Sequence, residues 1–315
     1  MNGVLGKADG SGEPSRPLVR GARFIDPHVL ASIGNLDLLA RIVIDGFVSG
    51  LHRAVFRGVS TEFAEHRPYS PGDDIRQLDW RLFARTDRLS IKTYEAETNA
   101  DLVLALDISR SMEFEGRGVR KLDYARFLLA SLAHLAGRQR DRIGLATFDR
   151  TLVSYVPPSA RHRERVMHTL ESVESRPGGD LAGSLEMLGS ALIRRGIVVV
   201  VSDFYLPPDE AVRALEALHV RGHDVIAIHL LDPVERDLGL EAVTVVEDME
   251  TGEQRPISPS ALRDEYQGLV QEHVDSLARL CRGHEVDYAC FDTATPLDHL
   301  LFRYLSQRAN WARVR

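Results

Sequence analysis

Cysteine, long apolar runs and excess positive charge are all scarce in this 315-residue chain. Its two cysteines, Cys281 and Cys290, form no CxxC pair, so we expect neither a disulfide framework nor a cysteine-based zinc site. The longest apolar runs, such as Ile197–Val201, are far below the ~20 residues that a membrane-spanning helix needs. These absences predict a cytoplasmic protein that does not insert into a membrane.

The charge balance argues against nucleic acid as a partner. The chain carries 39 Lys+Arg against 46 Asp+Glu, which gives a formal charge of −7. One basic stretch, residues 76–92, contains Trp80 and Phe83 and could be interpreted as a patch for single-stranded nucleic acid. Because Asp79 and Asp87 are interleaved with its basic residues, we favour local neutralisation or a protein interface.

The sequence pattern divides the chain into three segments. Residues 1–22 are rich in Gly, Ser and Pro without an apolar period, which predicts a disordered tail. Residues 23–98 combine a helical stripe over Pro27–Phe47 with Arg-rich, β-like pieces at 54–56 and 88–94. We therefore expect an N-terminal helix and a β-rich extension there. The third segment, residues 99–310, has the pattern of a single α/β domain.

Within this third segment, short apolar runs alternate with longer helical periods, which is typical of βαβ units and a largely parallel sheet. The runs 102–106 and 197–201 are apolar throughout, as expected of central strands covered on both faces. Strands at 143–148 and 152–156 are separated by only three residues, so they should form an antiparallel hairpin. Further strands are expected at 224–231, at an edge over 241–247 and at 286–291, with helices at 122–135, 161–173, 181–192, 208–220, after Pro259 and after Pro296.

Oxygen-bearing side chains follow two of the predicted strands. The string Asp107-Ile108-Ser109-Arg110-Ser111 follows the first core strand, and Asp203 follows the fourth. In a doubly wound sheet with an order such as 3-2-1-4-5-6, these two strand ends flank the point where the strand order reverses, and ligands bind there. Carboxylate and hydroxyl oxygens suit a small hard cation such as Mg²⁺. A coordination position left open could accept a carboxylate from another molecule.

These residues resemble the metal-ion-dependent adhesion site of von Willebrand factor A domains. Several other strings resemble the bacterial family called domain of unknown function 58, over about Leu30 to Arg308. The strings are Gly50-Leu51-His52, Glu62-Phe63, Tyr69–Asp74, Asp79-Trp80, Lys92–Glu95, Arg221–Val225 and Asp232-Pro233.

The resemblance implies a von Willebrand factor A-like, Rossmann-like fold and a non-enzymatic interaction module with a bound divalent cation, Mg²⁺ or else Mn²⁺ or Ca²⁺. It also implies action beside a MoxR-type AAA+ ATPase, as adaptor or co-chaperone, on an unknown client protein. The chain has no GxxxxGK[ST] loop, so ATP hydrolysis would belong to the partner. The metal ligands implied by the resemblance are Asp107, Ser109, Ser111 and Asp203.

One departure from the family pattern concerns a further ligand. The family usually has Gly-Gly-Thr-Asp before a helix, and its threonine ligates the metal, whereas this chain has Pro177-Gly178-Gly179-Asp180. Gly179 offers no hydroxyl group. Water or Asp180 would have to replace the missing ligand, and we expect weaker cation binding as a result.

Three other interpretations stay open. Asp107 and the two serines could merely cap the loop and helix that follow, just as Asp180 and Asp149 could be a helix cap and a turn residue. The chain could be a metal-dependent phosphohydrolase or a phosphoacceptor that uses Asp107, although Ser109 stands where haloacid-dehalogenase-type enzymes have their acid. Finally, it could be a scaffold whose metal site has decayed.

Overall fold

The computed structural model describes residues 27–54, 66–68, 90–92, 101–177, 180–239, 244–247, 253–298 and 301. The predicted tail, most of the extension between residues 55 and 100, and Gly179 lie outside the described residues. So does most of the segment after Pro296, where a last helix was predicted, although Leu297 and Leu301 are both buried.

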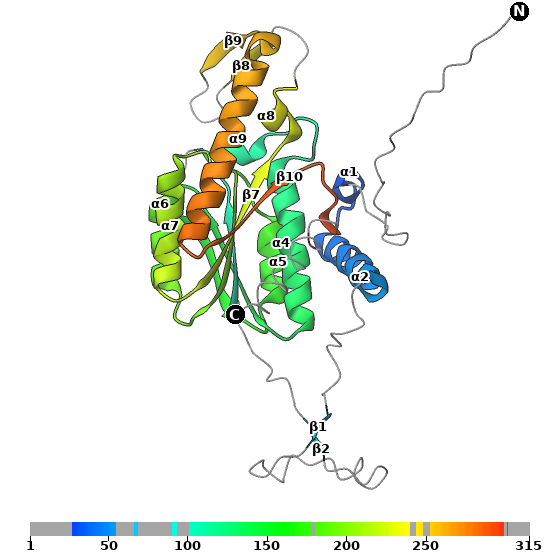
Figure 1. The fold of residues 1–315 in the computed structure, drawn as a ribbon. Coiled ribbons are helices and arrows are strands. Elements are labelled where there is room, and N and C mark those ends of the chain that lie inside the picture. Colours follow the sequence, from blue (N-terminus) through cyan, green and yellow to red (C-terminus); the bar gives the residue numbers. More distant parts are fainter. Residues whose placement is uncertain are drawn as a thin grey trace, which may run out of the picture.

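A six-stranded sheet with the order β10-β7-β6-β3-β4-β5 lies at the centre of the fold (Figure 1). All neighbouring strands are parallel except β5, which pairs antiparallel with β4. Numbered in chain order, the arrangement is 3-2-1-4-5-6, so the predicted doubly wound α/β fold with an antiparallel edge strand is confirmed. The strands are β3 (Asp101–Asp107), β4 (Arg142–Phe148), β5 (Leu152–Ser159), β6 (Gly196–Ser202), β7 (Asp224–Leu231) and β10 (Asp287–Asp292).

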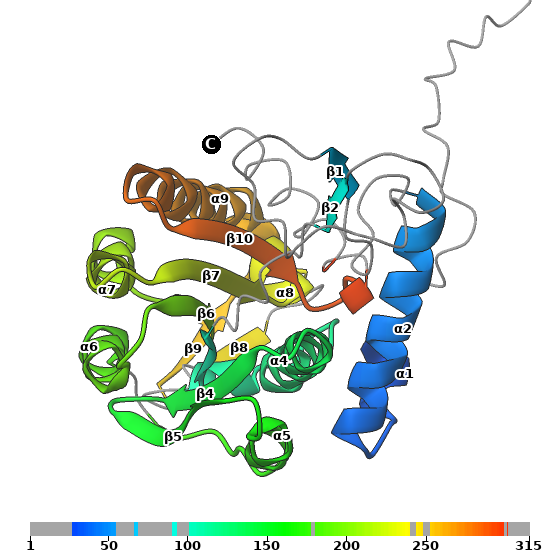
Figure 2. The ribbon, with the colours of Figure 1, turned by 90° about the horizontal axis from the view of Figure 1, so that it is seen from below.

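Helices cover both faces of this sheet (Figure 2). Successive side chains of a strand point to opposite faces, so Val199 and Val201 of β6 join one hydrophobic cluster while Val198 and Val200 join the other. A strand buried on both faces needs apolar residues at every position, which explains the unbroken run in β6. One face is covered by α4 (Lys121–Arg138) and α5 (Arg163–Glu171), the other by α6 (Leu181–Ala191), α7 (Pro208–Val220) and α9 (Pro259–Gly283).

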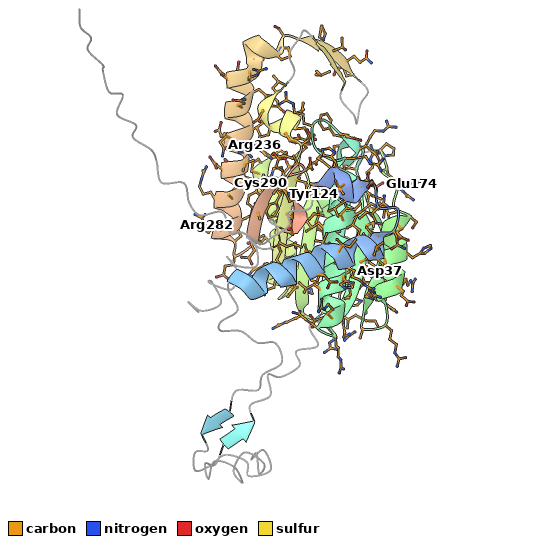
Figure 3. The ribbon with its side chains drawn as sticks, turned by 90° about the vertical axis from the view of Figure 1, so that its right-hand side faces the viewer. Asp37, Tyr124, Glu174, Arg236, Arg282 and Cys290 are labelled. Atoms are coloured by element: carbon orange, nitrogen blue, oxygen red, sulfur yellow. The ribbon has the colours of Figure 1, made fainter. Side chains whose placement is uncertain are left out.

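Two N-terminal helices, α1 (Pro27–Ala31) and α2 (Leu36–Ala54), add a layer outside α4 (Figure 2). The predicted helix over Pro27–Phe47 is thus present but interrupted, because the Asn35 side chain accepts a hydrogen bond from the Leu38 amide at 2.8 Å and starts α2 afresh. The buried side chains of α2 belong to the same hydrophobic cluster as α4 and the sheet. At one end of α2 (Figure 3), Asp37 pairs with Arg163 of α5 at 2.7 Å.

A small hairpin, β8 (Thr244–Glu247) paired antiparallel with β9 (Gln254–Ile257), stands beyond one end of the main sheet (Figure 1). The strand predicted over 241–247 is therefore present, but the prediction of an edge strand in the main series is wrong. The edge position beside β7 belongs to β10. Sequence reasoning missed β9 because Pro256 interrupts a segment of only four residues, and proline disfavours strand assignment.

Two further short strands, β1 (His66–Pro68) and β2 (Ser90–Lys92), pair in antiparallel register. Strand β2 falls inside the β-like piece predicted at 88–94. The piece predicted at 54–56 does not begin with a strand residue, since α2 continues through Ala54. Three residues are too few to distinguish a strand from the end of a helix by periodicity.

The shared core predicts that α2 contributes strongly to stability. Leu39 of α2 is fully buried, so Leu39→Ala should lower the free energy of unfolding by about 2–5 kcal/mol. Leu38→Ala is the matched control, because Leu38 is 49% exposed on the same helix. This substitution should change the free energy of unfolding by less than about 0.5 kcal/mol. Urea unfolding followed by circular dichroism measures both. Equal effects of the two substitutions would contradict the packing of α2 on α4.

Candidate cation-binding site

The two predicted carboxylates lie at the ends of neighbouring strands. Asp107 is the last residue of β3, and Asp203 follows Ser202, the last residue of β6. These strands pair in parallel at the place where the strand order reverses. Asp107 is 8% exposed and Asp203 2% exposed. The fold therefore brings both carboxylates, largely withdrawn from water, to one edge of the sheet.

The loop after β3 places two hydroxyl groups together. The Ser109 amide donates to Asp107 Oδ1 at 2.9 Å, which turns the chain sharply after the strand. A 3₁₀ turn, η2 (Arg110–Glu113), follows, and the Oγ atoms of Ser109 and Ser111 lie 3.1 Å apart. Two ligands at neighbouring corners of an octahedron with Mg–O distances of about 2.1 Å are separated by about 3 Å. The two hydroxyls, which are hydrogen-bonded to each other here, thus lie at a separation that Mg²⁺ could also accept.

The carboxyl group of Asp107 is held from both sides. Ser202 Oγ donates to its Oδ2 at 2.6 Å, while Oδ1 takes the Ser109 amide, and each oxygen keeps a further lone pair. Burial, and after it the charge of Asp203, raise the pKa of Asp107 to about 6, against the opposing effect of these hydrogen bonds. A cation and a proton therefore compete for Asp107 below about pH 6.

Asp203 already has a cationic partner within the chain. Its Oδ2 lies 2.8 Å from Nζ of Lys121, a side chain with no exposed surface, and the same Nζ lies 2.7 Å from Oε1 of Glu235. Burial lowers the pKa of Lys121, but the charges of Asp203 and Glu235 outweigh it, so that the pKa is raised and the amine stays an ammonium group. One oxygen of Asp203 is thus engaged by Lys121.

Glu235 and the loop before α4 are fixed by a single carboxylate, Asp232. It caps α8 (Pro233–Asp237), accepting from Val234, while its own amide donates to Glu235 Oε2 at 2.9 Å. The amides of residues 116, 117 and 118 also donate to Asp232, at 2.9–3.1 Å. Burial raises the pKa of Asp232, but these backbone hydrogen bonds outweigh it and lower the pKa below its ordinary value.

Asp180 and Asp149 make local hydrogen bonds of the kind that the capping interpretation expects. Asp180 is the N-cap of α6 and accepts from the Gly183 amide at 2.9 Å, and Asp149 accepts from the Thr151 amide at 3.1 Å. Arg176, four residues before Asp180, nevertheless lies beside the site, because its amide donates to the carbonyl oxygen of Ile108 at 2.7 Å. The role of Asp180 as a metal ligand stays a prediction.

Sequence reasoning missed Ser202, Lys121 and Glu235. A signal for Lys121 exists in the composition, since the chain has only three lysines, Lys7, Lys92 and Lys121, against 36 arginines. A lysine in a chain that otherwise uses arginine indicates a place where a compact ammonium group is needed. Glu235 has a weaker signal, because it stands three residues after Asp232 as in a capping box.

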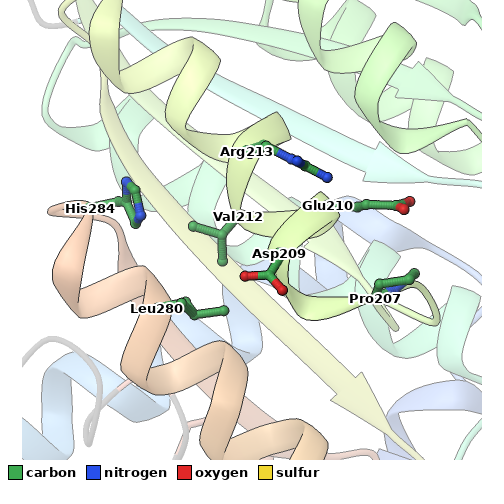
Figure 4. A pocket seen from close by; sticks show the side chains of 7 residues that line it. All are labelled: Pro207, Asp209, Glu210, Val212, Arg213, Leu280 and His284. Carbon is green, nitrogen blue, oxygen red and sulfur yellow. The ribbon is translucent and has the colours of Figure 1, made fainter.

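Other candidate sites are less well equipped. Within the described part of the chain, no three His, Cys, Asp or Glu side chains are grouped to hold a metal ion, so a cation would depend on the serine hydroxyls. A pocket of about 380 Å³ lies between α7 and α9, lined by Asp209, Arg213 and Leu280 among others (Figure 4). A second pocket, of about 630 Å³, lies against α9 and includes Cys290. Neither is lined by Asp107 or the two serines.

The strand order, the antiparallel edge strand, and the aspartate and two serines after the first strand define a von Willebrand factor A-like α/β domain. Residues 65–276 match the family described as Protein of unknown function DUF58. The chain is also 31% identical over 264 residues to the uncharacterized protein Rv1480 of Mycobacterium tuberculosis, an alignment that covers 82% of this chain and 83% of the relative. The chain belongs to the DUF58 family.

Several solved structures are similar to this chain. BatB from Bacteroides thetaiotaomicron aligns with a TM-score of 0.45 and 17% identity over 67% of this chain and 99% of BatB. An aerotolerance-related membrane protein from Bacteroides fragilis aligns with a TM-score of 0.47 and 16% identity over 66% of this chain and 99% of that protein. The SpRpn10 VWA domain aligns with a TM-score of 0.40 and 12% identity over 64% of this chain and 94% of that domain. No helix in the described ranges of this chain is long and apolar enough to cross a membrane.

The raised pKa of Asp107 predicts a pH dependence of stability. Its stabilising contribution is fully present below about pH 4 and is lost as the pH rises through about 6, because the folded chain holds this proton more tightly than the unfolded chain. With a metal chelator present, the free energy of unfolding of the wild type minus that of Asp107→Asn should fall by about 2 kcal/mol between pH 4 and pH 7. Denaturant titrations across that range measure the difference.

A matched control for the loss of one carboxylate is Asp149→Asn, in the turn that follows β4. A difference between wild type and Asp107→Asn that stays constant from pH 4 to pH 7 would contradict the burial of an ionised Asp107.

Proposed function

We propose that this chain is a cytoplasmic protein-interaction module that binds a partner through a divalent cation at the edge of its sheet. The observation that carries the proposal is the 3.1 Å spacing of the Ser109 and Ser111 hydroxyls beside the buried Asp107 carboxylate. Asp203, whose second carboxylate oxygen is not engaged by Lys121, completes the donor set directly or through water. The cation is Mg²⁺ or, with the same oxygen donors, Mn²⁺ or Ca²⁺.

When bound, the cation supplies a positive charge with an exchangeable position that a carboxylate of the partner can occupy. The residues of this chain orient the donors. Asp107 is positioned by Ser202 and by the Ser109 amide, and the loop before α4 is tied down by Asp232. Such preorganisation lets a site select its ligand without rearranging.

We further propose that the partner is a MoxR-type AAA+ ATPase, which this module serves as an adaptor or co-chaperone toward an unknown client protein. Membership of the DUF58 family supports this assignment through the association that the family resemblance implies. The chain lacks a phosphate-binding GxxxxGK[ST] loop, so mechanical work on a client would need the nucleotide chemistry of a partner.

The alternative of a phosphohydrolase gains no support from the geometry. A phosphotransfer to Asp107 needs a nearby acid, and the residue two positions later is Ser109, whose hydroxyl lies against Ser111. Asp203 is paired with Lys121 at 2.8 Å instead of standing free as an acid beside Asp107.

Direct cation binding tests the first part of the proposal. We expect isothermal titration with Mg²⁺ and Mn²⁺ to give millimolar or tighter dissociation constants for the wild type. Asp107→Ala and the double variant Ser109→Ala/Ser111→Ala should weaken binding at least tenfold, because each removes oxygen donors. Asp149→Ala, outside the donor set, should leave it unchanged. Absence of binding, or binding that ignores Asp107, would favour the interpretation of a scaffold with a decayed metal site.

Co-purification tests the second part. Tagged full-length chain should recover the MoxR-type ATPase of the same organism in Mg²⁺, and recovery should fall at least tenfold in chelator or with Asp107→Ala. Quantitative mass spectrometry of the captured proteins provides the measurement, with Asp149→Ala as the control. Recovery that is insensitive to both changes would place the interface elsewhere on the chain, and no recovery of an AAA+ protein would reject the partner.

A further inference from the structure

The buried carboxylates of Asp107 and Asp203, the partly buried carboxylate of Glu235 and the buried ammonium group of Lys121 lie at this edge of the sheet. Asp203 and Glu235 each place an oxygen on Lys121, at 2.8 Å and 2.7 Å, whereas Asp107 is held by neutral donors from Ser202 and Ser109. With all groups ionised, this cluster keeps two negative charges that Lys121 does not neutralise. A divalent cation carries the charge that balances them.

Lys121 is enclosed on every side that the structure describes. It begins α4, and its Nζ lies 4.8 Å from the ring centre of Tyr205 and 5.9 Å from that of Phe114, in addition to the two carboxylates. Its backbone amide donates to the Phe114 carbonyl at 3.1 Å. The larger, planar guanidinium group of arginine differs in shape from the compact ammonium group that these four neighbours surround.

A cation beside Asp107 would be close to this ammonium group, because Ser202 contacts Asp107 at 2.6 Å and the next residue, Asp203, contacts Lys121 at 2.8 Å. Two positive charges that share one carboxylate repel each other, and this repulsion is weakly screened in a site withdrawn from water. The hold of Lys121 on one oxygen of Asp203 also removes that oxygen from the donors open to the cation.

We propose that Lys121 is a built-in counter-cation of the candidate site, a positioning residue that retains one oxygen of Asp203 and thereby limits the affinity for a divalent cation. The identity of the bound cation rests on the proposed function, but the role of Lys121 does not require that the wild type binds one tightly. In the cation-free chain, Lys121 keeps Asp203 and Glu235 paired, so the edge of the sheet stays ordered when the cation leaves.

Lys121→Met keeps an unbranched side chain that is only one atom shorter and removes its charge. We expect this variant to unfold more readily in chelator, because the buried Asp203 and the partly buried Glu235 lose their partner. Its Mg²⁺ dissociation constant, measured by isothermal titration, should fall at least tenfold. Mg²⁺ should also raise its unfolding temperature by more than it raises that of the wild type, a gain that a merely structural role of Lys121 does not produce.

A second variant separates the hold on Asp203 from the net charge and guards against failure to fold. Lys121→Met/Glu235→Gln leaves the cluster with the same net charge as the wild type while freeing Asp203, so it should also bind Mg²⁺ more tightly. Adding Asp107→Ala to either variant should abolish the gain. Arg120→Met is the matched control, since Arg120 pairs with Glu113 and Asp123 outside the cage and its loss should change the affinity less than twofold.

The outcomes distinguish this inference from the proposed function. Mg²⁺ binding by the Lys121 variants but not by the wild type would support the counter-cation and reject cation binding by the native chain. Binding by the wild type that the variants match, or only weaken, would overturn the counter-cation and leave the proposed function in place. If none of these proteins binds Mg²⁺, both are wrong.

Discussion

A single buried ammonium group connects the elements that surround the candidate cation site at the edge of the sheet. Lys121 stands at the start of α4 and pairs with the carboxylate that follows β6 and with the one in α8. Removal of one partner from such a buried pair leaves an uncompensated charge, a loss of several kcal/mol in typical proteins. The position of the loop after β3, and hence of the two serines, depends on the elements that this group and Asp232 tie together.

The sheet was predictable because each strand can be recognised from a short segment of sequence. A strand covered on both faces must be apolar at every position, so β3 and β6 are recognisable as apolar runs. The turn at Asp149 is too short for a crossover, so β5 has to pair antiparallel with β4. The site carboxylates followed from the same logic, since each stands directly after such a strand. Asp107, the two serines and Asp203 could thus be placed at one edge before any coordinates were known.

The partners of those carboxylates could not be predicted in the same way. Lys121 is 82 residues from Asp203 and 114 from Glu235 in sequence, and no local pattern distinguishes a buried lysine at a helix start from an exposed one. The pairing of β8 with β9 was similarly hidden, because a proline in a four-residue segment contradicts strand propensity and only the tertiary setting overrides it. Interactions between distant residues set the electrostatics of the site, whereas local patterns set its location.

Because α2 packs over α4, the hydrophobic core of the sheet includes residues from the N-terminal segment. Every strand of the main sheet lies after residue 100, so the sheet alone suggests that the chain could be shortened to that point. Such a fragment would present the outer, apolar side of α4 to water where Leu39, Val43 and Ile44 now cover it. We therefore expect the sheet domain to be less stable without α2. Side chains of α2, before residue 55, and of β3, after residue 100, belong to the same hydrophobic cluster.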